Sequence, residues 1–372
     1  MTRRWTITGL ALALLFGAIA LFAWTLDPAR ALYAWLVAFF AAYTTATGAL
    51  LLLLMGDATE SVWLAVLRRP VEALAGTLPL LALLFVPILL SLGRVYPWIR
   101  SEELVRGREV WLNAPFFVVR SALYLLVPAV LAELVLARSR RGTERARRRR
   151  LGAIGLPIVI LLVTFAGFDW IMSLEPGYFS TAFGLIPATG GFMAALSLVA
   201  LTLAFARGRG ELAEAGPDHV HAIGKLMLTA VCFWAYLAFF QYMLGWIANL
   251  PAEARWYLPR TRDEWGAVAA ALLALHFVLP FFALLSRELK RRAIPLAIVG
   301  AGLVLAHWLD VFWLSIPALR RGGASFHIAD LVSALAVAGA VLAVATWRAS
   351  RAARSARRED PLLERSLRYR SE

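Results

Sequence analysis

The feature that most constrains this chain is a series of apolar runs, each about as long as a lipid bilayer is thick. A helix needs ~20 apolar residues to cross ~30 Å of hydrocarbon. Because 61% of the 372 residues are hydrophobic, a soluble globular protein is excluded. The predicted fold class is an all-α polytopic membrane protein with about ten transmembrane helices. The predicted spans are residues 5–24, 30–54, 71–92, 115–137, 152–172, 183–206, 223–248, 265–286, 294–317 and 327–347.

The spans group into two sets of four that run in the same sense, helices two to five and helices six to nine. Each set closes with an acidic residue among aromatic side chains, at Asp169 and at Asp310. We therefore expect two four-helix bundles, related as a parallel internal repeat and flanked by helices one and ten. Residues 1–347 are predicted to form this transmembrane domain. Residues 348–372 are predicted to form a basic cytoplasmic tail on anionic lipid, or a loosely ordered one.

Basic residues gather in the loops on one side of the predicted bundles. The main blocks are residues 138–150, 287–292 and 348–370. Basic loops beside membrane spans stay in the cytoplasm, so both termini are predicted to be cytoplasmic. The same arrangement explains the formal net charge of +14, and no nucleic-acid partner is predicted.

Four titratable residues stand out in the spans. An ionisable side chain at the bilayer centre costs ~3 kcal/mol, so such residues usually face a bundle interior or water. Asp169, His276, His307 and Asp310 are expected to form a proton path in the outer half of the membrane. His307 and Asp310 are three residues apart on one helix face, where the carboxylate can orient the imidazole or exchange a proton with it. The alternative is structural: each acid pairs with Arg120 or a helix end, and His276 bonds a backbone carbonyl.

Three further side chains suit the neighbourhood of a quinone ring: Trp170, Gln241 and Tyr242. Flat aromatic groups beside an acid fit such a ring, although packing is the simpler interpretation of Trp170. Cys232 is the only cysteine, so the chain alone cannot ligate an iron-sulfur cluster by cysteines or attach a haem covalently. His276 and His307 could ligate one haem b, but nothing requires it. No metal site is predicted, and any redox centre is expected in a partner.

Five groups of motifs stand out in combination: Leu112 to Phe117 with Arg120, Phe168 to Pro176 with Phe179 to Thr181, Phe233 to Tyr236 with Gln241 to Met243, His276 to Phe281, and His307 to Asp310. Together they resemble the ActF type of membrane subunit of bacterial alternative complex III, within the NrfD or polysulfide-reductase membrane-anchor family. The resemblance extends from about the second to the ninth span. The family usually carries an acid before the Gly-Lys pair matched by Gly224 and Lys225, whereas Ala222 stands in that region here, so a cytoplasmic proton entry built on that acid does not carry over.

The resemblance implies two four-helix bundles with flanking helices, in agreement with the repeat expected above. It also implies a membrane subunit of a respiratory-chain oxidoreductase that passes electrons from quinol to cytochrome c or another acceptor, in the bacterial inner membrane. Such a subunit supports quinol oxidation and proton translocation without a redox cofactor of its own, and quinol or menaquinol is the expected ligand. The implied partners are membrane lipid, a homologous NrfD-like subunit, and iron-sulfur and multihaem cytochrome c subunits on the outer side.

Two other functions stay open at this stage. A secondary transporter also combines a repeat with ionisable groups near the midplane. The sequence shows no pair of helices broken by Gly and Pro at matching positions of the two halves, which counts against a transporter. A purely structural anchor for peripheral electron-transfer subunits would need only long outer loops, and the segment from residue 92 to 113 is long enough to pack on another protein.

Overall fold

The computed structural model describes residues 2–140, 145–248, 251–319, 323–354 and 361–371. Residues 141–144 of the predicted basic block and residues 355–360 of the predicted tail lie outside this part of the chain. The described residues form helices and connecting segments without a strand. Ten helical stretches among them are long and apolar enough to cross a membrane. The chain is therefore an all-α, multi-pass membrane protein, as predicted.

The first five spans lie close to the predicted positions. They consist of α1 (Thr2–Leu26), α2 (Pro28–Ala58), α3 (Leu64–Ala75) followed by α4 (Leu78–Leu84) and α5 (Val86–Leu89), α8 (Ala114–Arg140), and α9 (Arg145–Trp170).

The other five spans follow the same plan. They consist of α10 (Leu185–Arg207), α11 (Pro217–Ala248), α13 (Asp263–Leu272) followed by η3 (Leu273–Val278) and α14 (Leu279–Leu285), α16 (Ala293–Ser315), and α17 (Ile328–Arg354). Short elements connect the spans: α6 (Leu92–Val95), η1 (Pro97–Ile99), α7 (Glu102–Val105), η2 (Met172–Leu174), α12 (Pro251–Thr261), α15 (Arg287–Arg291), η4 (Ile316–Ala318) and α18 (Pro361–Leu367).

Local sequence explains where several of these helices begin and break. The Asp27 side chain accepts a hydrogen bond from the Arg30 amide at 3.1 Å, and Pro28 follows at the first helical position, so α2 starts with a capped end. Proline at the first turn also begins α4 and α5, which divides the third span into three pieces. The eighth span contains a π-helical turn, η3, immediately before Pro280. Such turns are frequent at functional sites.

The helices pack as two bundles, which agrees with the predicted fold class. The first bundle contains α2, α3 to α5, α8 and α9, and the second contains α10, α11, α13 to α14 and α16. Helices α2 and α10 join the bundles, while α1 pairs with α17 on the flank. The α2–α10 contact depends on small residues, because a Cβ at Gly191 would lie 2.4 Å from the Thr44 backbone and one at Gly48 would lie 2.6 Å from the Phe192 Cα.

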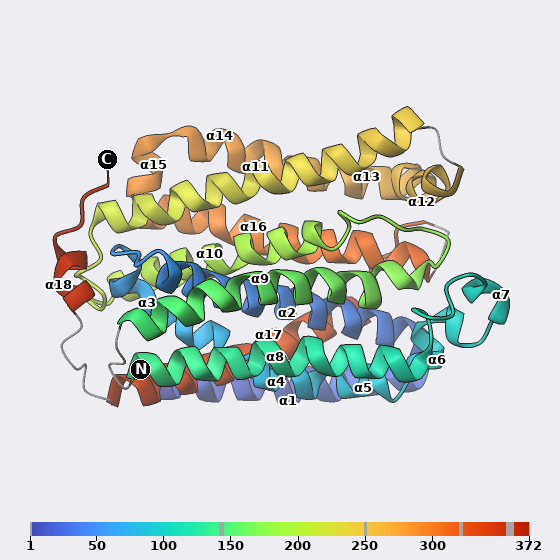
Figure 1. The fold of residues 1–372 in the computed structure, drawn as a ribbon, viewed down its shortest axis with the longest axis horizontal. Helices are drawn as coiled ribbons and strands as arrows, with labels where there is room; N and C mark the ends of the chain where they lie inside the picture. Colours follow the sequence, from blue (N-terminus) through green and yellow to red (C-terminus); the bar gives the residue numbers. More distant parts are fainter. Residues whose placement is uncertain (1, 141–144, 249–250, 320–322, 355–360, 372) are drawn as a thin grey trace.

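The helices run roughly parallel, so the molecule has two ends (Figure 1). One end holds the beginning of α1 together with α15 and α18, and is called the tail end below. The opposite end holds α7 and α12, and is called the α12 end. This arrangement puts the first and last described residues at the same end of the molecule, as the ten-span topology predicts.

Candidate functional site

Asp169 lies at the end of α9 and is fully buried in the first bundle. Arg120 binds it through two hydrogen bonds, from Nε to Oδ2 at 2.6 Å and from Nη2 to Oδ1 at 3.0 Å. The Tyr124 hydroxyl donates to Oδ2 and the Trp111 indole to Oδ1, each at 2.9 Å. The Arg120 guanidinium in turn lies 4.1 Å from the ring of Trp111 and 4.3 Å from that of Phe116. This geometry matches the structural alternative given above, in which Asp169 pairs with Arg120.

Trp170 belongs to the aromatic core of the first bundle. Its ring is fully buried, and its indole donates to the Ser121 hydroxyl at 3.0 Å. It lies against the rings of Phe39, Phe40, Tyr43, Phe85 and Tyr124. Trp170 is not among the side chains that line the cavity described next, so the structure places it with packing residues and apart from the predicted quinone neighbours Gln241 and Tyr242.

A cavity of about 730 Å³ lies in the second bundle, towards the α12 end. Its walls come from α11, α12, α13 with η3, α14 and α16, and from the segment before α10. This volume is within the range that small organic ligands occupy, and the lining is largely apolar and aromatic. The lining side chains include Tyr178, Phe183, Cys232, Trp234, Tyr236, Phe239, Gln241, Tyr242, Trp256, Tyr257, Phe277, Phe281, Asp310 and Trp313.

One flank of the cavity reaches the outer surface of the bundle. Tyr236 is 57% exposed, Phe239 is 65% exposed and Leu273 is 56% exposed, and all three line the cavity. The spans that carry these side chains are apolar enough to cross a membrane, so this exposed apolar flank suits contact with acyl chains. A lipophilic molecule could therefore enter the cavity sideways from the bilayer.

Asp310 is the only acidic residue that the described part of the chain places in the cavity wall, and its surroundings differ from those of Asp169. Its side chain is buried and accepts one hydrogen bond, from the Trp234 indole to Oδ2 at 3.0 Å. Within the described residues no cation pairs with it. On the same wall, the Gln241 amide oxygen accepts a hydrogen bond from the Ser180 hydroxyl. The carboxylate thus keeps acceptor capacity for a ligand.

Two buried histidines lie behind the Trp234 ring. The His276 ring is 4.1 Å from the Trp234 ring and 6.5 Å from the His307 ring, between centroids. Neither nitrogen of His276 has a hydrogen-bond partner among the described residues. His276 lies on the π-helical turn η3, and a Cβ at Gly190 would come within 2.5 Å of His307 Nδ1, so the backbone of α10 approaches the pair closely.

His307 bonds across the two bundles instead of bonding Asp310. Its Nε2 lies 2.9 Å from the Thr44 hydroxyl of α2. Because that hydroxyl has a single proton and two backbone carbonyls in reach, of Phe40 and Ala41, we assign Nε2 as the donor and Nδ1 as the free acceptor. No hydrogen bond joins His307 to Asp310 among the described residues, since Nε2 of His307 faces Thr44 and Oδ2 of Asp310 accepts from Trp234.

The predicted path residues therefore divide into two places. Asp310, His276 and His307 lie in one cluster of the second bundle, whereas Asp169 is held by Arg120 in the first. Gln241 and Tyr242 line the cavity beside the cluster.

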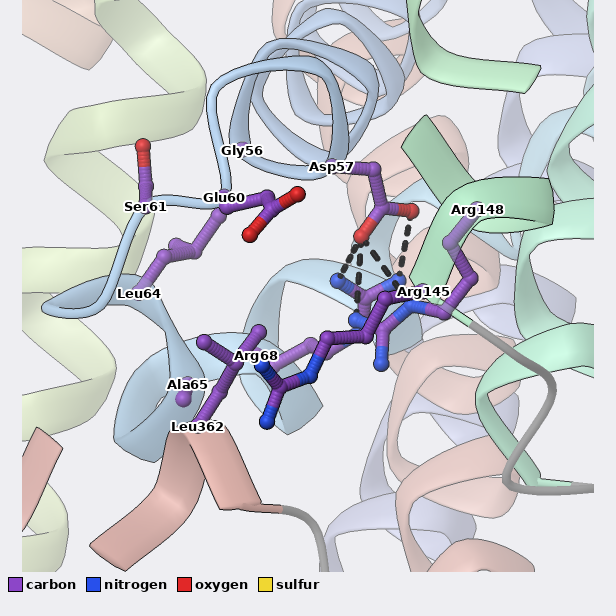
Figure 2. A pocket seen from close by; sticks show the side chains of 10 residues that line it. All are labelled: Gly56, Asp57, Glu60, Ser61, Leu64, Ala65, Arg68, Arg145, Arg148 and Leu362. Carbon is purple, nitrogen blue, oxygen red and sulfur yellow. Dashed lines mark hydrogen bonds and ion pairs between the residues drawn. The ribbon is translucent and has the colours of Figure 1, made fainter. Parts of the chain in front are cut away.

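An ion-pair network at the tail end was not foreseen from the sequence (Figure 2). Asp57, the last acid of α2, accepts two hydrogen bonds from Arg68, at 2.7 and 3.0 Å, and one from Arg148 Nη2 at 3.0 Å. Arg68 also donates to Glu72 at 2.8 Å. The charges are mutually satisfied around a space of about 20 Å³, so the network ties α2, α3 and α9 together. The only feature of the sequence that could have indicated this network is the position of Asp57 at the end of an apolar run.

A second clamp not foreseen from the sequence closes the cavity at the α12 end. Arg260 of α12 is 1% exposed and donates to Glu175 at 2.5 Å and to the Leu314 carbonyl at 3.1 Å. Burial lowers the pKa of its guanidinium, and the Glu175 carboxylate opposes that effect. The neighbouring Trp256 ring stacks on Tyr178 with centroids 4.4 Å apart. Together these contacts fix α12 as one wall of the cavity.

Comparison with known proteins adds no family to this description. No family model matches the chain, and no curated protein matches it. The fold and the site define a class, a multi-pass helical membrane protein with a lipid-facing cavity and a buried acid in its wall. The resemblance to alternative complex III subunits stays a prediction from motifs.

Proposed function

We propose that the chain is an integral membrane subunit of a quinol-oxidising respiratory complex of the alternative complex III type, and that its second bundle binds the quinol ring. The observation that carries the proposal is the cavity of about 730 Å³ with Asp310 in its wall. A flat aromatic ring with hydroxyl groups matches an aromatic, lipid-facing space that offers one carboxylate and one amide. The motifs shared with the NrfD family support the same reaction.

In this proposal Asp310 accepts a proton from the ring hydroxyl. Oxidation of a quinol to a quinone releases two protons and two electrons, and each needs a separate acceptor. Asp310 has one hydrogen bond, from Trp234, so its remaining lone pairs can receive the hydroxyl. Gln241 and Tyr242 hold the opposite part of the ring. The electrons pass to iron-sulfur and multihaem cytochrome c subunits, the partners that the motif resemblance implies.

From Asp310 the proton would continue through the histidine pair. The Trp234 indole only donates, so it orients the carboxylate and cannot relay a proton. Both nitrogens of His276 and Nδ1 of His307 have no hydrogen-bond partner among the described residues, so the pair has positions at which a proton can be taken up. Asp169 is left out of this route because Arg120, Tyr124 and Trp111 already saturate it.

The proposed setting is the bacterial inner membrane, with the tail end in the cytoplasm. The basic blocks that flank the spans at that end support this orientation. The cavity then lies in the outer half of the bilayer, next to the side on which the electron-accepting subunits and a homologous NrfD-like subunit would dock.

The test is a substitution that fills the cavity. Ala269 lines it, so Ala269→Phe should weaken binding of a short-chain quinone by about tenfold or more, a loss of ~1.4 kcal/mol. The matched control is Ala267→Phe on the same helix, where the side chain is exposed and outside the lining. Binding is measured by titration calorimetry on the purified complex in detergent. Equal affinity in both variants would remove the cavity from the proposal.

A further inference from the structure

The amide of Gln241 is held by the protein on one side and is available to a ligand on the other. Gln241 belongs to α11, lines the cavity and is 4% exposed. Its Oε1 accepts a hydrogen bond from the Ser180 hydroxyl. Among the described residues its Nε2 donates to no acceptor. The NH₂ group is therefore the part of this side chain that a molecule in the cavity can meet.

The Ser180 hydroxyl decides which atom of the amide faces the cavity. The Ser180 Oγ accepts from the Ala182 backbone amide at 3.3 Å and carries one proton of its own to donate. If the Gln241 amide were reversed, its N–H groups would face Oγ, and the hydroxyl proton would have no acceptor among the described residues. We therefore assign Oε1 to Ser180 and Nε2 to the cavity, because this orientation pairs both groups.

Ser180 is in turn held by the wall of the cavity. It lies between η2 and α10, in the same segment as Tyr178 and Phe183, which both line the cavity. The Trp256 ring of α12 stacks on Tyr178 and meets the Phe183 ring edge-on at 6.0 Å between centroids. The Ser180 backbone amide also faces the Met172 Sδ at 3.4 Å. These contacts fix the position from which the hydroxyl reaches Gln241.

The cavity wall thus presents opposite polarities at two places. An ionised Asp310 only accepts hydrogen bonds, whereas the Gln241 NH₂ only donates them. Trp234, which bonds Asp310, and Gln241 lie two helical turns apart on one face of α11. We propose that Ser180 is a positioning residue that fixes Gln241 as a donor. The site then takes a ring with a hydroxyl at the Asp310 end and an oxygen acceptor at the Gln241 end. This inference rests on the quinol site proposed above.

The two ends respond differently to the oxidation state of the ring. A hydroxyl both donates and accepts, so a quinol can bond Asp310 and Gln241 together. A quinone carries two carbonyl oxygens, which only accept. One of them bonds the Gln241 NH₂, while the other meets an ionised Asp310 without a proton between the two acceptors. Gln241 therefore holds both forms of the ring, and Asp310 favours the reduced form.

The test compares Ser180→Ala with Ser180→Thr, which keeps the hydroxyl. Without the hydroxyl the amide is free to turn Oε1 to the ligand, where it accepts from a quinol but repels a quinone carbonyl. In Ser180→Ala the Kd of a short-chain quinone should rise about fivefold, or ~1 kcal/mol, and that of its quinol less than about twofold. Ser180→Thr should keep both affinities. Titration calorimetry on the purified complex in detergent, without oxygen for the quinol, measures them.

A second variant separates the orientation of the amide from its presence. Gln241→Met keeps the length of the side chain and removes the donor, so it should weaken quinone and quinol by similar factors. Equal changes of both affinities in Ser180→Ala, or no change in either, would overturn the inference. The quinol site itself would stand in that case if Ala269→Phe still weakened binding. Equal affinity of Ala269→Phe and its control would remove the site, and this inference with it.

Discussion

At the scale of single residues, the two membrane aspartates have opposite surroundings. Asp169 receives four hydrogen bonds, two of them from a guanidinium, whereas Asp310 receives one from a neutral indole. Both lie at the ends of apolar runs and beside aromatic residues, so their local sequences do not predict different roles. Their difference comes from Arg120 and Tyr124, which lie 49 and 45 residues before Asp169 and have no counterpart at Asp310.

The first prediction concerns the ion pair of Asp169. Asp169→Asn leaves the Arg120 charge buried without its counter-ion, and loss of one partner of a buried pair costs ~3–5 kcal/mol. We expect a lower unfolding midpoint in detergent and less protein in the membrane. Arg120→Leu added to Asp169→Asn should recover part of the loss, because it removes the unpaired charge. A normal midpoint for the single variant would contradict a structural role for the pair.

The second prediction concerns the approach of α10 to the histidine pair. Gly190→Ala places a Cβ within 2.5 Å of His307 Nδ1, so the ring or the helix must move, at a cost of ~1–3 kcal/mol. Gly302 of α16 has open space around its Cβ position, and Gly302→Ala should be neutral or stabilise by ~0.5–1 kcal/mol. Thermal unfolding of both variants compares them directly. If both alanines shift the midpoint equally, the packing around His307 is looser than described.

At the scale of elements, hydropathy predicts where the spans lie in the sequence but not which spans pack against each other. All ten spans were predictable because membrane crossing needs a fixed length of apolar sequence. The pairing of α1 with α17, and the central position of α2, depend on close backbone contacts such as that of Gly191 with Thr44, which leave no periodic signal. The Thr44 to His307 bond, which joins residues 263 positions apart, was unpredictable for the same reason.

The interrupted spans bear on the transporter alternative. The third span is broken between α3, α4 and α5, and the eighth contains the π-helical turn η3. The third span is the second helix of its bundle and the eighth is the third helix of its own, so the interruptions do not match between the halves. Matched interruptions are the feature expected of a transporter with repeats. Among the described residues the element plan therefore lacks the feature that a transporter with repeats would show.

The third prediction concerns α12 as a wall of the cavity. Glu175→Gln removes the counter-charge of the buried Arg260, and a hydrogen bond to a charged group contributes ~1.5–3 kcal/mol. Amide hydrogen exchange should become faster within α12 and stay unchanged in α2. Glu288→Gln is the control, since its pair with Arg292 is largely exposed and contributes ~0–1 kcal/mol. Unchanged exchange in α12 for Glu175→Gln would show that the helix is held by other contacts.

At the scale of the whole molecule, the two bundles were predictable as a topology, whereas the cavity was not. Its lining combines the segment around Tyr178 with α11, α12, α13, η3, α14 and α16, and α12 was not expected as a helix at all. Residues His276, His307 and Asp310 could be nominated individually because each is costly to bury. To predict that they lie apart from Asp169, one would need to know that the cavity is enclosed by the second bundle and not by the interface between the two bundles.

The fourth prediction concerns orientation in the membrane. Reporter fusions after Arg150 and after Arg370 should both be active on the cytoplasmic side, because basic loops are retained there. A fusion after Tyr257, in α12, should be active on the outer side. The two ends seen in Figure 1 require the first pair to agree with each other and to differ from the third. A pair that disagrees, or a third fusion that agrees with the pair, is incompatible with ten spans, and a fully inverted pattern contradicts the orientation.

The central claim is that Asp310 accepts a proton from quinol in the cavity of the second bundle. The most direct measurement is quinol oxidation and proton release by the assembled complex with Asp310→Asn, a change that keeps the shape of the side chain and its bond from Trp234. We expect normal assembly with turnover lowered by about a hundredfold or more, in the range of ~10²–10⁴ that general acid–base groups contribute. Proton release should fall in parallel with turnover. Normal turnover and normal proton release in a fully assembled Asp310→Asn complex would contradict the account.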